Sequence, residues 1–356
     1  MPSFREGKVL EIVEERTGLV RARIEVSEGE LLAAAYPQLL GSVRAGDRVI
    51  VNTTGIDLDL GTGGEGFILW NLDRDDAELG RGHIIKLRYT ALQTDVLAAE
   101  APESVHHAAL ADTAELSGTP VVACGLHSQI AGVAAGIKAA RPDARVAYAM
   151  GDGGALPLAW SDLVHRSSEA GLIDVTCTYG HAFGGAIEAV NVFSALIATR
   201  IAGGADAIVV AMGPGGVGTG TRLGFSGIEQ GQVLDAATAL GGRAIACMRI
   251  SFDDVRERHE GISHHGITTL QLAAARRATV VLPELPQSRA EILRRQCDEA
   301  GVGDRHEIVE ADGAPGVELL KESGLDPTTM GRALSDSPEP FLAAAAAGAV
   351  AAGTLA

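Results

Sequence analysis

The first seventy residues alternate between polar and apolar side chains over short stretches, which are separated by glycines and charged turns. Alternation with a period of two is typical of a β-strand that buries one face. Five strands are predicted, at residues 7–13, 19–26, 31–36, 47–52 and 66–70. Residues 1–73 are therefore expected to form a small antiparallel β-barrel domain, of the size of an OB or SH3-like barrel.

Helical periodicity begins only after a charged stretch at residues 72–82. Residues 74–104 are predicted to be a linker with one extra strand at 83–90, which either closes the barrel or begins the second domain. From residue 105 onward, amphipathic helices alternate with nearly continuous apolar strands at intervals of about thirty residues. Repeated β-loop-α units of this kind form a parallel sheet that is covered by helices on both faces.

Residues 105–356 are accordingly expected to form an α/β domain with a Rossmann-like, doubly wound parallel sheet. If the strand at 83–90 joined this sheet, the strand count would instead permit a closed (β/α)8 barrel. Unequal helix lengths and the separate N-terminal β segment favour the open sheet. The predicted strands are residues 120–124, 145–150, 173–179, 207–211, 243–250, 279–283 and 306–310. The predicted helices are residues 105–116, 130–140, 158–170 and 186–201, one that starts at a Ser226–Glu229 capping box, and one that opens at Ser251.

A glycine-rich loop at residues 212–221 directly follows the apolar strand 207–211. Glycines allow successive backbone N–H groups to turn toward an anion, and threonine hydroxyls can add hydrogen bonds. The loop lacks the Gly-Lys-Ser/Thr ending of a Walker A loop and the context of a dinucleotide fingerprint. The glycine-rich loop is expected either to bind an anion or to pack near a helix without contacting a ligand. The candidate ligand-binding residues are Gly213, Gly215, Gly216, Gly218, Thr219, Gly220, Thr221 and Arg222.

Histidine and aspartate residues occupy other predicted loops at strand ends. His127, Asp152 and His181 follow three successive strands, and His264 and His265 lie at a predicted helix start. The carboxyl ends of parallel strands share one edge of the sheet, so these five residues are candidate catalytic groups. They would hold a divalent metal, act without a metal in acid–base catalysis, or only hydrogen-bond within loops.

Other titratable residues fit simpler interpretations. The charged run at residues 256–260, which contains His259, is typical of a solvent-exposed helix face. Cys124, Cys177 and Cys247 lie in predicted strands and are expected to be buried packing residues. The four cysteines contain no C-x-x-C pair, which argues against a thiolate zinc site and favours a reducing, cytoplasmic compartment.

The formal net charge of −17 narrows the classes of partner that the chain is expected to bind. So acidic a chain repels phosphate backbones and anionic membrane surfaces, which argues against nucleic-acid and membrane binding. A small anionic ligand remains compatible with local basic residues. No secretory signal pattern is present at the N-terminus. The barrel is expected to cap or dimerise the larger domain, which makes a homodimer the candidate assembly.

Several segments resemble an uncharacterised bacterial family, the domain of unknown function 3866. They include Val51-Asn52-Thr53-Thr54, the glycine-rich loop, Arg249-Ile250-Ser251-Phe252 and Gly261-Ile262-Ser263-His264-His265. The resemblance implies a bacterial cytoplasmic protein and brings no activity with it. From the residues alone, the leading hypothesis is an enzyme acting on a small phosphorylated or anionic metabolite. The alternative is a non-catalytic, ligand-sensing or regulatory protein whose barrel contacts a partner or a second copy.

Overall fold

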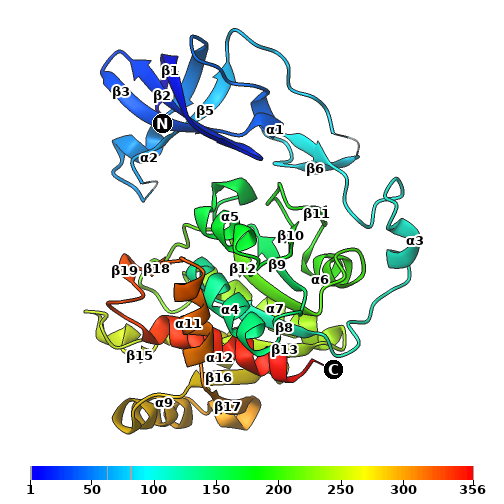
Figure 1. Cartoon of the computed structure of the whole chain (residues 1–356), viewed down its shortest axis with the longest axis vertical. Coiled ribbons are helices and arrows are strands. Elements are labelled where there is room, and N and C mark those ends of the chain that lie inside the picture. Colours follow the sequence, from blue (N-terminus) through cyan, green and yellow to red (C-terminus); the bar gives the residue numbers. More distant parts are fainter. Residues whose placement is uncertain (1, 62, 81, 356) are drawn as a thin grey trace. The chain divides into compact units, whose positions relative to one another are not determined.

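The computed structural model describes residues 2–61, 63–80 and 82–355 (Figure 1). The chain divides into two compact units, Met1–Leu97 and Ala98–Ala356. This boundary falls inside the segment 74–104 that the sequence assigns to the linker. Each unit is described by itself below.

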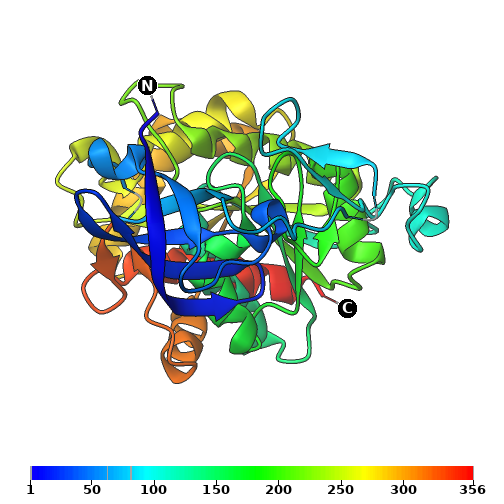
Figure 2. The same ribbon diagram turned by 90° about the horizontal axis from the view of Figure 1, so that it is seen from above.

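The first unit contains a closed five-stranded β-barrel with the strand order β1-β2-β3-β5-β4, drawn in blue shades in Figure 2. All neighbouring pairs are antiparallel except β3–β5, which is parallel. The order is that of an OB-fold, and alternate side chains such as Ile24, Val49 and Ile68 fill its core. The strands are β1 (Phe4–Arg16), β2 (Leu19–Val26), β3 (Gly29–Ala35), β4 (Arg48–Asn52) and β5 (Gly66–Asn71), with short helices α1 (Pro37–Leu40) and α2 (Thr54–Asp57).

The extra strand predicted at residues 83–90 is shorter than expected. It forms β6 (Ile84–Lys86), whose pairing partner among the described residues is β7 (Thr94–Val96), in a separate two-stranded sheet. The strand therefore neither closes the barrel nor begins the large sheet.

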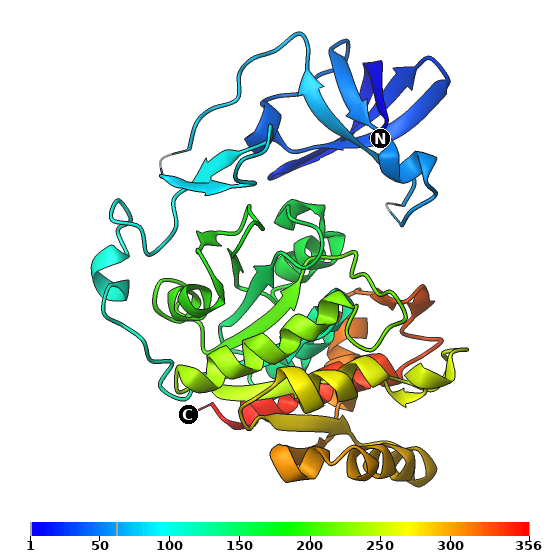
Figure 3. The same ribbon diagram turned by 180° about the vertical axis from the view of Figure 1, so that it is seen from behind.

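The second unit is built on an open eight-stranded sheet with the order β11-β10-β9-β12-β8-β13-β16-β17 (Figure 3). All its neighbouring strands are parallel, as predicted, and the open order rules out the alternative (β/α)8 barrel. Its strands are β8 (Pro120–Cys124), β9 (Val146–Gly151), β10 (Val175–Thr178), β11 (Ile187–Glu188), β12 (Ala207–Met212), β13 (Arg243–Cys247), β16 (Thr279–Pro283) and β17 (Glu307–Ala311).

Both faces of this sheet are buried, which explains why its strands read as continuous apolar runs. Along β8, Val121 and Ala123 pack into one core and Val122 and Cys124 into the other. The helices are α3 (His107–Leu110), α4 (Ile130–Ala140), α5 (Asp162–Glu169), α6 (Val192–Ile201), α7 (Gln230–Ala239), α8 (His264–Thr268), α9 (Gln287–Glu299), α10 (Val302–Arg305), α11 (Ala314–Glu322) and α12 (Glu339–Gly353). Among the described residues, none of the helices has both the length and the apolar character needed to cross a bilayer.

The helices α4 and α12 cross unusually closely because glycines face the contact. A methyl group on Gly136 would overlap the backbone carbonyl of Ala345, and one on Gly348 would overlap that of Val133. The alanine-rich sequence of α12 completes this thin interface, in which Ala344 through Ala347 are fully buried.

Four predicted elements of the second unit also differ from the structure. The helix expected at 105–116 is reduced to α3, and the one expected at 186–201 starts only at α6, where Asn191 caps it through the N–H groups of Phe193 and Ser194. The strand expected at 243–250 ends at Cys247. Residues Ile250–Ser251 instead form β14, which pairs with β15 (Gly261–Ile262), so no helix opens at Ser251.

Candidate functional site

A cavity of about 160 Å³ lies at the carboxyl ends of the three adjacent strands β12, β8 and β13. The connection after β8 leads toward β9, whereas the connection after the adjacent β13 leads the opposite way along the sheet, toward β16. Ligands in open α/β sheets bind at such a reversal of strand order. Among the lining residues, Met212 ends β12, Leu126 follows β8 and Arg249 follows β13. We call this space the first cavity.

The glycine-rich loop forms one wall of the first cavity through Gly216 and Gly218. The N–H of Val217 donates to the Ser226 hydroxyl at 3.0 Å, and the Ser226 N–H donates to the Val217 carbonyl at 2.9 Å. Ser226 thus holds the loop through these two hydrogen bonds and does not form the predicted capping box with Glu229. Residues Ser226–Glu229 form a 3-10 turn that precedes α7. The N–H groups of Gly216 and Gly218 make no hydrogen bond within the described part of the chain, so they are available to a ligand.

The other predicted ligand-binding residues have local partners. The hydroxyls of Thr219 and Thr221 lie 2.9 Å apart, and both also bond to the backbone of Gly224, which closes the loop on itself. The guanidinium of Arg222 donates to the Gln271 side chain at 3.3 Å.

The remaining loop glycines serve the backbone. Gly215 and Gly220 have positive φ angles of 87° and 75°, which other residues adopt with difficulty. At Gly213 a side chain would overlap the carbonyl of Ala155, so this glycine permits two loops to touch.

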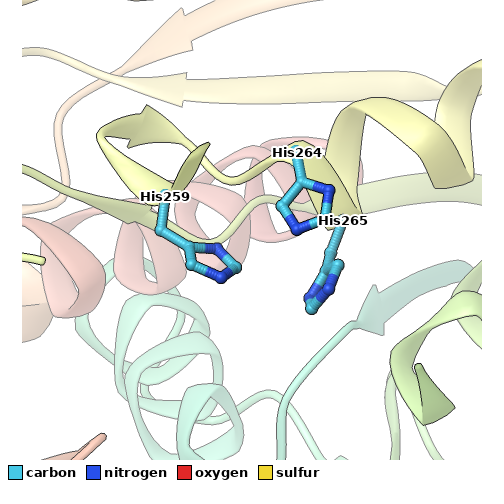
Figure 4. Close-up of side chains that lie close together, drawn as sticks. All are labelled: His259, His264 and His265. Carbon is cyan, nitrogen blue, oxygen red and sulfur yellow. The ribbon is translucent and has the colours of Figure 1, made fainter. Parts of the chain in front are cut away.

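A cluster of three histidines borders the same cavity (Figure 4). His259 precedes β15, whereas His264 and His265 begin α8, and the three rings face a common space. The ring centroids are 4.2 to 5.1 Å apart. His265 also stacks on Phe225 at 4.0 Å with an interplanar angle of 9°, which links the cluster to the end of the glycine-rich loop.

The hairpin β14–β15 places these histidines. The Gln296 side chain on α9 accepts the N–H of Ile262 at 2.8 Å and donates to the carbonyl of Glu260 at 2.9 Å. The buried Ser263 hydroxyl caps α8 by accepting the His265 N–H at 3.3 Å. It also lies 2.8 Å from Nδ1 of His259.

Two arginines and one aspartate complete the positive wall of the cavity. Arg249 donates to Asp254 at 2.6 Å and to Nδ1 of His259 at 2.7 Å. Arg256 donates to both carboxylate oxygens of Asp254 at 2.9 Å. Arg256 and then Arg249 hold the pKa of the Asp254 carboxyl well below its usual range. Two guanidinium groups therefore share one carboxylate, which leaves the cavity with excess positive charge.

The same environment keeps the imidazoles neutral at physiological pH. Burial, followed by the charges of Arg249 and Arg256, lowers the pKa of His259 to about 4. Burial and the neighbouring His264 lower the pKa of His265 to about 4, and burial also lowers the pKa of His264. Neutral imidazoles offer lone pairs to a proton donor or a metal.

His127 lies in a second, more open cavity of about 440 Å³, which shares Leu126, Gly216 and Met330 with the first. Its Nδ1 donates to the Met212 carbonyl at 3.0 Å, and its Nε2 accepts the hydroxyl of Ser161 at 2.7 Å. Burial lowers the pKa of His127 to about 4, and the bond to Met212 opposes this only in part. The imidazole is thus held neutral in one orientation.

Asp152 and His181 meet at the ends of the neighbouring strands β9 and β10. Asp152 accepts the backbone N–H of His181 at 2.8 Å. Burial, and then the charge of Asp152, raise the pKa of Glu229 at the start of α7. The charge of Asp152 therefore favours the protonated form of the Glu229 carboxyl group.

The five histidine and aspartate residues selected from the sequence consequently fall into three groups. His264 and His265 border or support the first cavity, His127 lines the second, and Asp152 and His181 form a pair with each other. Sequence reasoning missed His259 and Arg256 because the run 256–260 was interpreted as a solvent-exposed helix face, and it missed Arg249 because residues 243–250 were read as a strand. Only 2% of the surface of His259 is exposed, so the interpretation of the run was wrong for His259, whereas the other four residues of the run are exposed. Three histidines within seven residues were the available signal.

A comparison with protein families identifies the family to which most of the chain can be matched. A family model described as a protein of unknown function (DUF3866) matches residues 32–348. The chain belongs to this family. The match includes both walls of the first cavity, the glycine-rich loop and the histidine cluster. No curated protein and no solved structure matched the chain.

Proposed function

We propose that the protein is an enzyme acting on a small phosphorylated or anionic metabolite, which binds in the first cavity. The observation that supports this most directly is the meeting of Arg249, Arg256 and the glycine-rich loop around one space at the carboxyl ends of three central strands. A volume of about 160 Å³ suits a small metabolite better than a nucleotide.

The anion would be held by backbone and side chains together. The N–H groups of Gly216 and Gly218 and the guanidinium of Arg256 supply donors, and charge-assisted hydrogen bonds of this kind are the strong ones. Without a bound metal, the neutral His265 beside them would accept or donate a proton, since its ring lines the cavity and is fixed by Phe225. His127 would act from the second cavity, which shares a wall with the first.

Anion binding can be tested with inorganic phosphate and a panel of small phosphorylated and carboxylated metabolites. A ligand of the folded state raises the apparent melting temperature. Arg256→Gln is expected to weaken binding by about 10- to 100-fold, because a charged hydrogen bond contributes about 1.5–3 kcal/mol. The matched control is Arg166→Gln, since Arg166 lines only the second cavity. Loss of binding in the control alone would move the ligand to the second cavity and refute the assignment.

The alternative is a non-catalytic, ligand-sensing protein that uses the same cavity. Its support is the separate OB-like barrel, on which Phe4, Val13 and Trp70 are each about half exposed and available to a partner or to a second copy in a homodimer. Mass spectrometry of a bound ligand after prolonged incubation separates the two functions. The enzyme consumes it, and the sensor returns it unchanged. A cytoplasmic location in bacteria is part of the same proposal and follows from the family resemblance.

A further inference from the structure

The strongest unexplained feature of the histidine cluster beside the first cavity is the Nε2 atom of His264. This atom is buried and has no hydrogen-bond partner among the described residues. An unsatisfied buried polar atom costs about 1–3 kcal/mol, so it requires an explanation. His264 does not line the cavity itself; it lies beside His259 and His265, which do.

We propose that His259, His264 and His265 bind one divalent transition metal of the zinc class. Each of the three rings offers a nitrogen, and these three atoms lie within 4.8 Å of one another. Two nitrogens bound to one tetrahedral zinc ion at about 2.0–2.1 Å lie about 3.3–3.4 Å apart. The three ring nitrogens must therefore close by up to roughly 1.4 Å, which rotations of the side chains provide. Figure 4 shows the three rings already turned toward the space between them.

Hydrogen bonds around the cluster can fix the ligand atoms. When Nε2 of His259 binds the metal, its Nδ1 carries the proton and donates to the Ser263 hydroxyl, which lies 2.8 Å away. Metal-binding histidines commonly donate their second N–H to such a partner. Arg249 then gives up its bond to the imidazole and keeps its bond to Asp254 at 2.6 Å.

The type of ligand atom determines which metals the site would bind. Three imidazole nitrogens suit zinc, cobalt, nickel or copper, whereas magnesium and calcium prefer oxygen ligands. Three protein ligands leave a fourth position, as in catalytic zinc sites. His259 and His265 border the first cavity, so that position faces the proposed anion. The excess positive charge from Arg249 and Arg256 opposes an added cation, and an anionic ligand or hydroxide in the fourth position offsets it. What the metal does in turnover rests on the proposed function, but metal binding itself does not.

The test uses the full chain purified without a polyhistidine tag and stripped with a chelator. Co²⁺ is titrated with detection by visible absorption, and Zn²⁺ by competition with a chromogenic chelator. Mg²⁺ serves as the negative comparison. We expect one Zn²⁺ or Co²⁺ per chain. His264→Ala should weaken binding by at least about 100-fold, and Ser263→Ala by about 10- to 100-fold, the range for partners of metal-binding histidines. His165→Ala, a more exposed histidine on α5, is the matched control and should bind as the wild type does.

A second variant keeps the proposal falsifiable if His264→Ala does not fold. His264→Cys retains a metal ligand and should add a thiolate-to-Co²⁺ charge-transfer band in the near ultraviolet. Saturable binding that is equal in the wild type and His264→Ala would overturn the proposal. So would a wild-type chain that takes up neither Zn²⁺ nor Co²⁺, or a folded His264→Cys without the new band. Anion binding is measured separately, as the response of Arg256→Gln to phosphate, so the two proposals can fail independently.

Discussion

Replacing His127 by glutamine should remove about 2 kcal/mol of the stability that the second unit loses in mild acid, a loss to which His259 and His265 contribute in the same way. The imidazole has a pKa of about 4 in the folded chain, against an ordinary value of 6.5. Between these values the unfolded chain binds a proton that the folded chain excludes. The lowered pKa therefore has no effect well above pH 6.5, and its destabilising effect grows as the pH falls toward 4.

The size of the effect follows from the two pKa values. Between pH 7 and pH 5, exclusion of one proton by a group with a folded pKa near 4 lowers the free energy of unfolding by about 2 kcal/mol. His127→Gln also loses the hydrogen bonds to Met212 and Ser161 or replaces them. That change is nearly independent of pH, so it cancels when each protein is compared with itself at the two pH values.

The two tryptophans provide the assay. Trp70 lies on β5 of the first unit, and Trp160 lies in the second unit beside Ser161, which bonds His127. In a Trp70→Phe background, fluorescence of Trp160 during urea unfolding reports on the second unit alone. The wild-type loss between pH 7 and pH 5 should exceed that of His127→Gln by about 2 kcal/mol. His165→Gln should retain the wild-type loss. Equal losses for the wild type and His127→Gln would show that His127 is not kept neutral by burial.

Two further substitutions test the packing and the charge network with the same assay. Gly348→Ala should lower the free energy of unfolding by about 3 kcal/mol, because its methyl group overlaps the Val133 carbonyl, whereas Gly353→Ala at the end of the same helix meets no atom within 4 Å and should cost nothing. A tolerated Gly348→Ala would mean that α4 and α12 can separate easily. Asp254→Ala should cost about 3 kcal/mol, because it leaves the largely buried Arg249 without its carboxylate. The exposed Glu257→Ala is its control, and similar effects of the two would argue against the shared ion pair.

Local sequence patterns predicted the fold class and most of the strands. Alternation and turn signals identified the five barrel strands, most of which bury one face, and the apolar runs identified the parallel strands because both of their faces are buried. The order of the strands within each sheet could not be predicted from these local patterns, since it depends on contacts between residues far apart in the chain. Residues 250–262 were misassigned for the same reason: their structure comes from the β14–β15 pairing and from Gln296, which lies more than thirty residues away.

The candidate site was predicted in outline only. The glycine-rich loop was located correctly at the end of β12, but the roles within it were not separable by sequence. Gly216 and Gly218 face the cavity, while Thr219 and Thr221 close the loop. The roles of the predicted site residues stay predictions. His259 was discounted because charged neighbours normally indicate exposure, and here those neighbours turn outward or pair with Asp254 while the imidazole turns inward.

The close contact between α4 and α12 has a consequence for how the chain folds. These helices are separated by about two hundred residues, and α12 also contacts β8, β13 and β16 in the middle of the sheet. During synthesis the ribosome releases α4 long before α12, so the apolar face of α4 and part of the sheet stay uncovered in the meantime. Contacts this distant in sequence form slowly. The nascent second unit is thus expected to be open to chaperones, and to aggregation, until its last helix emerges.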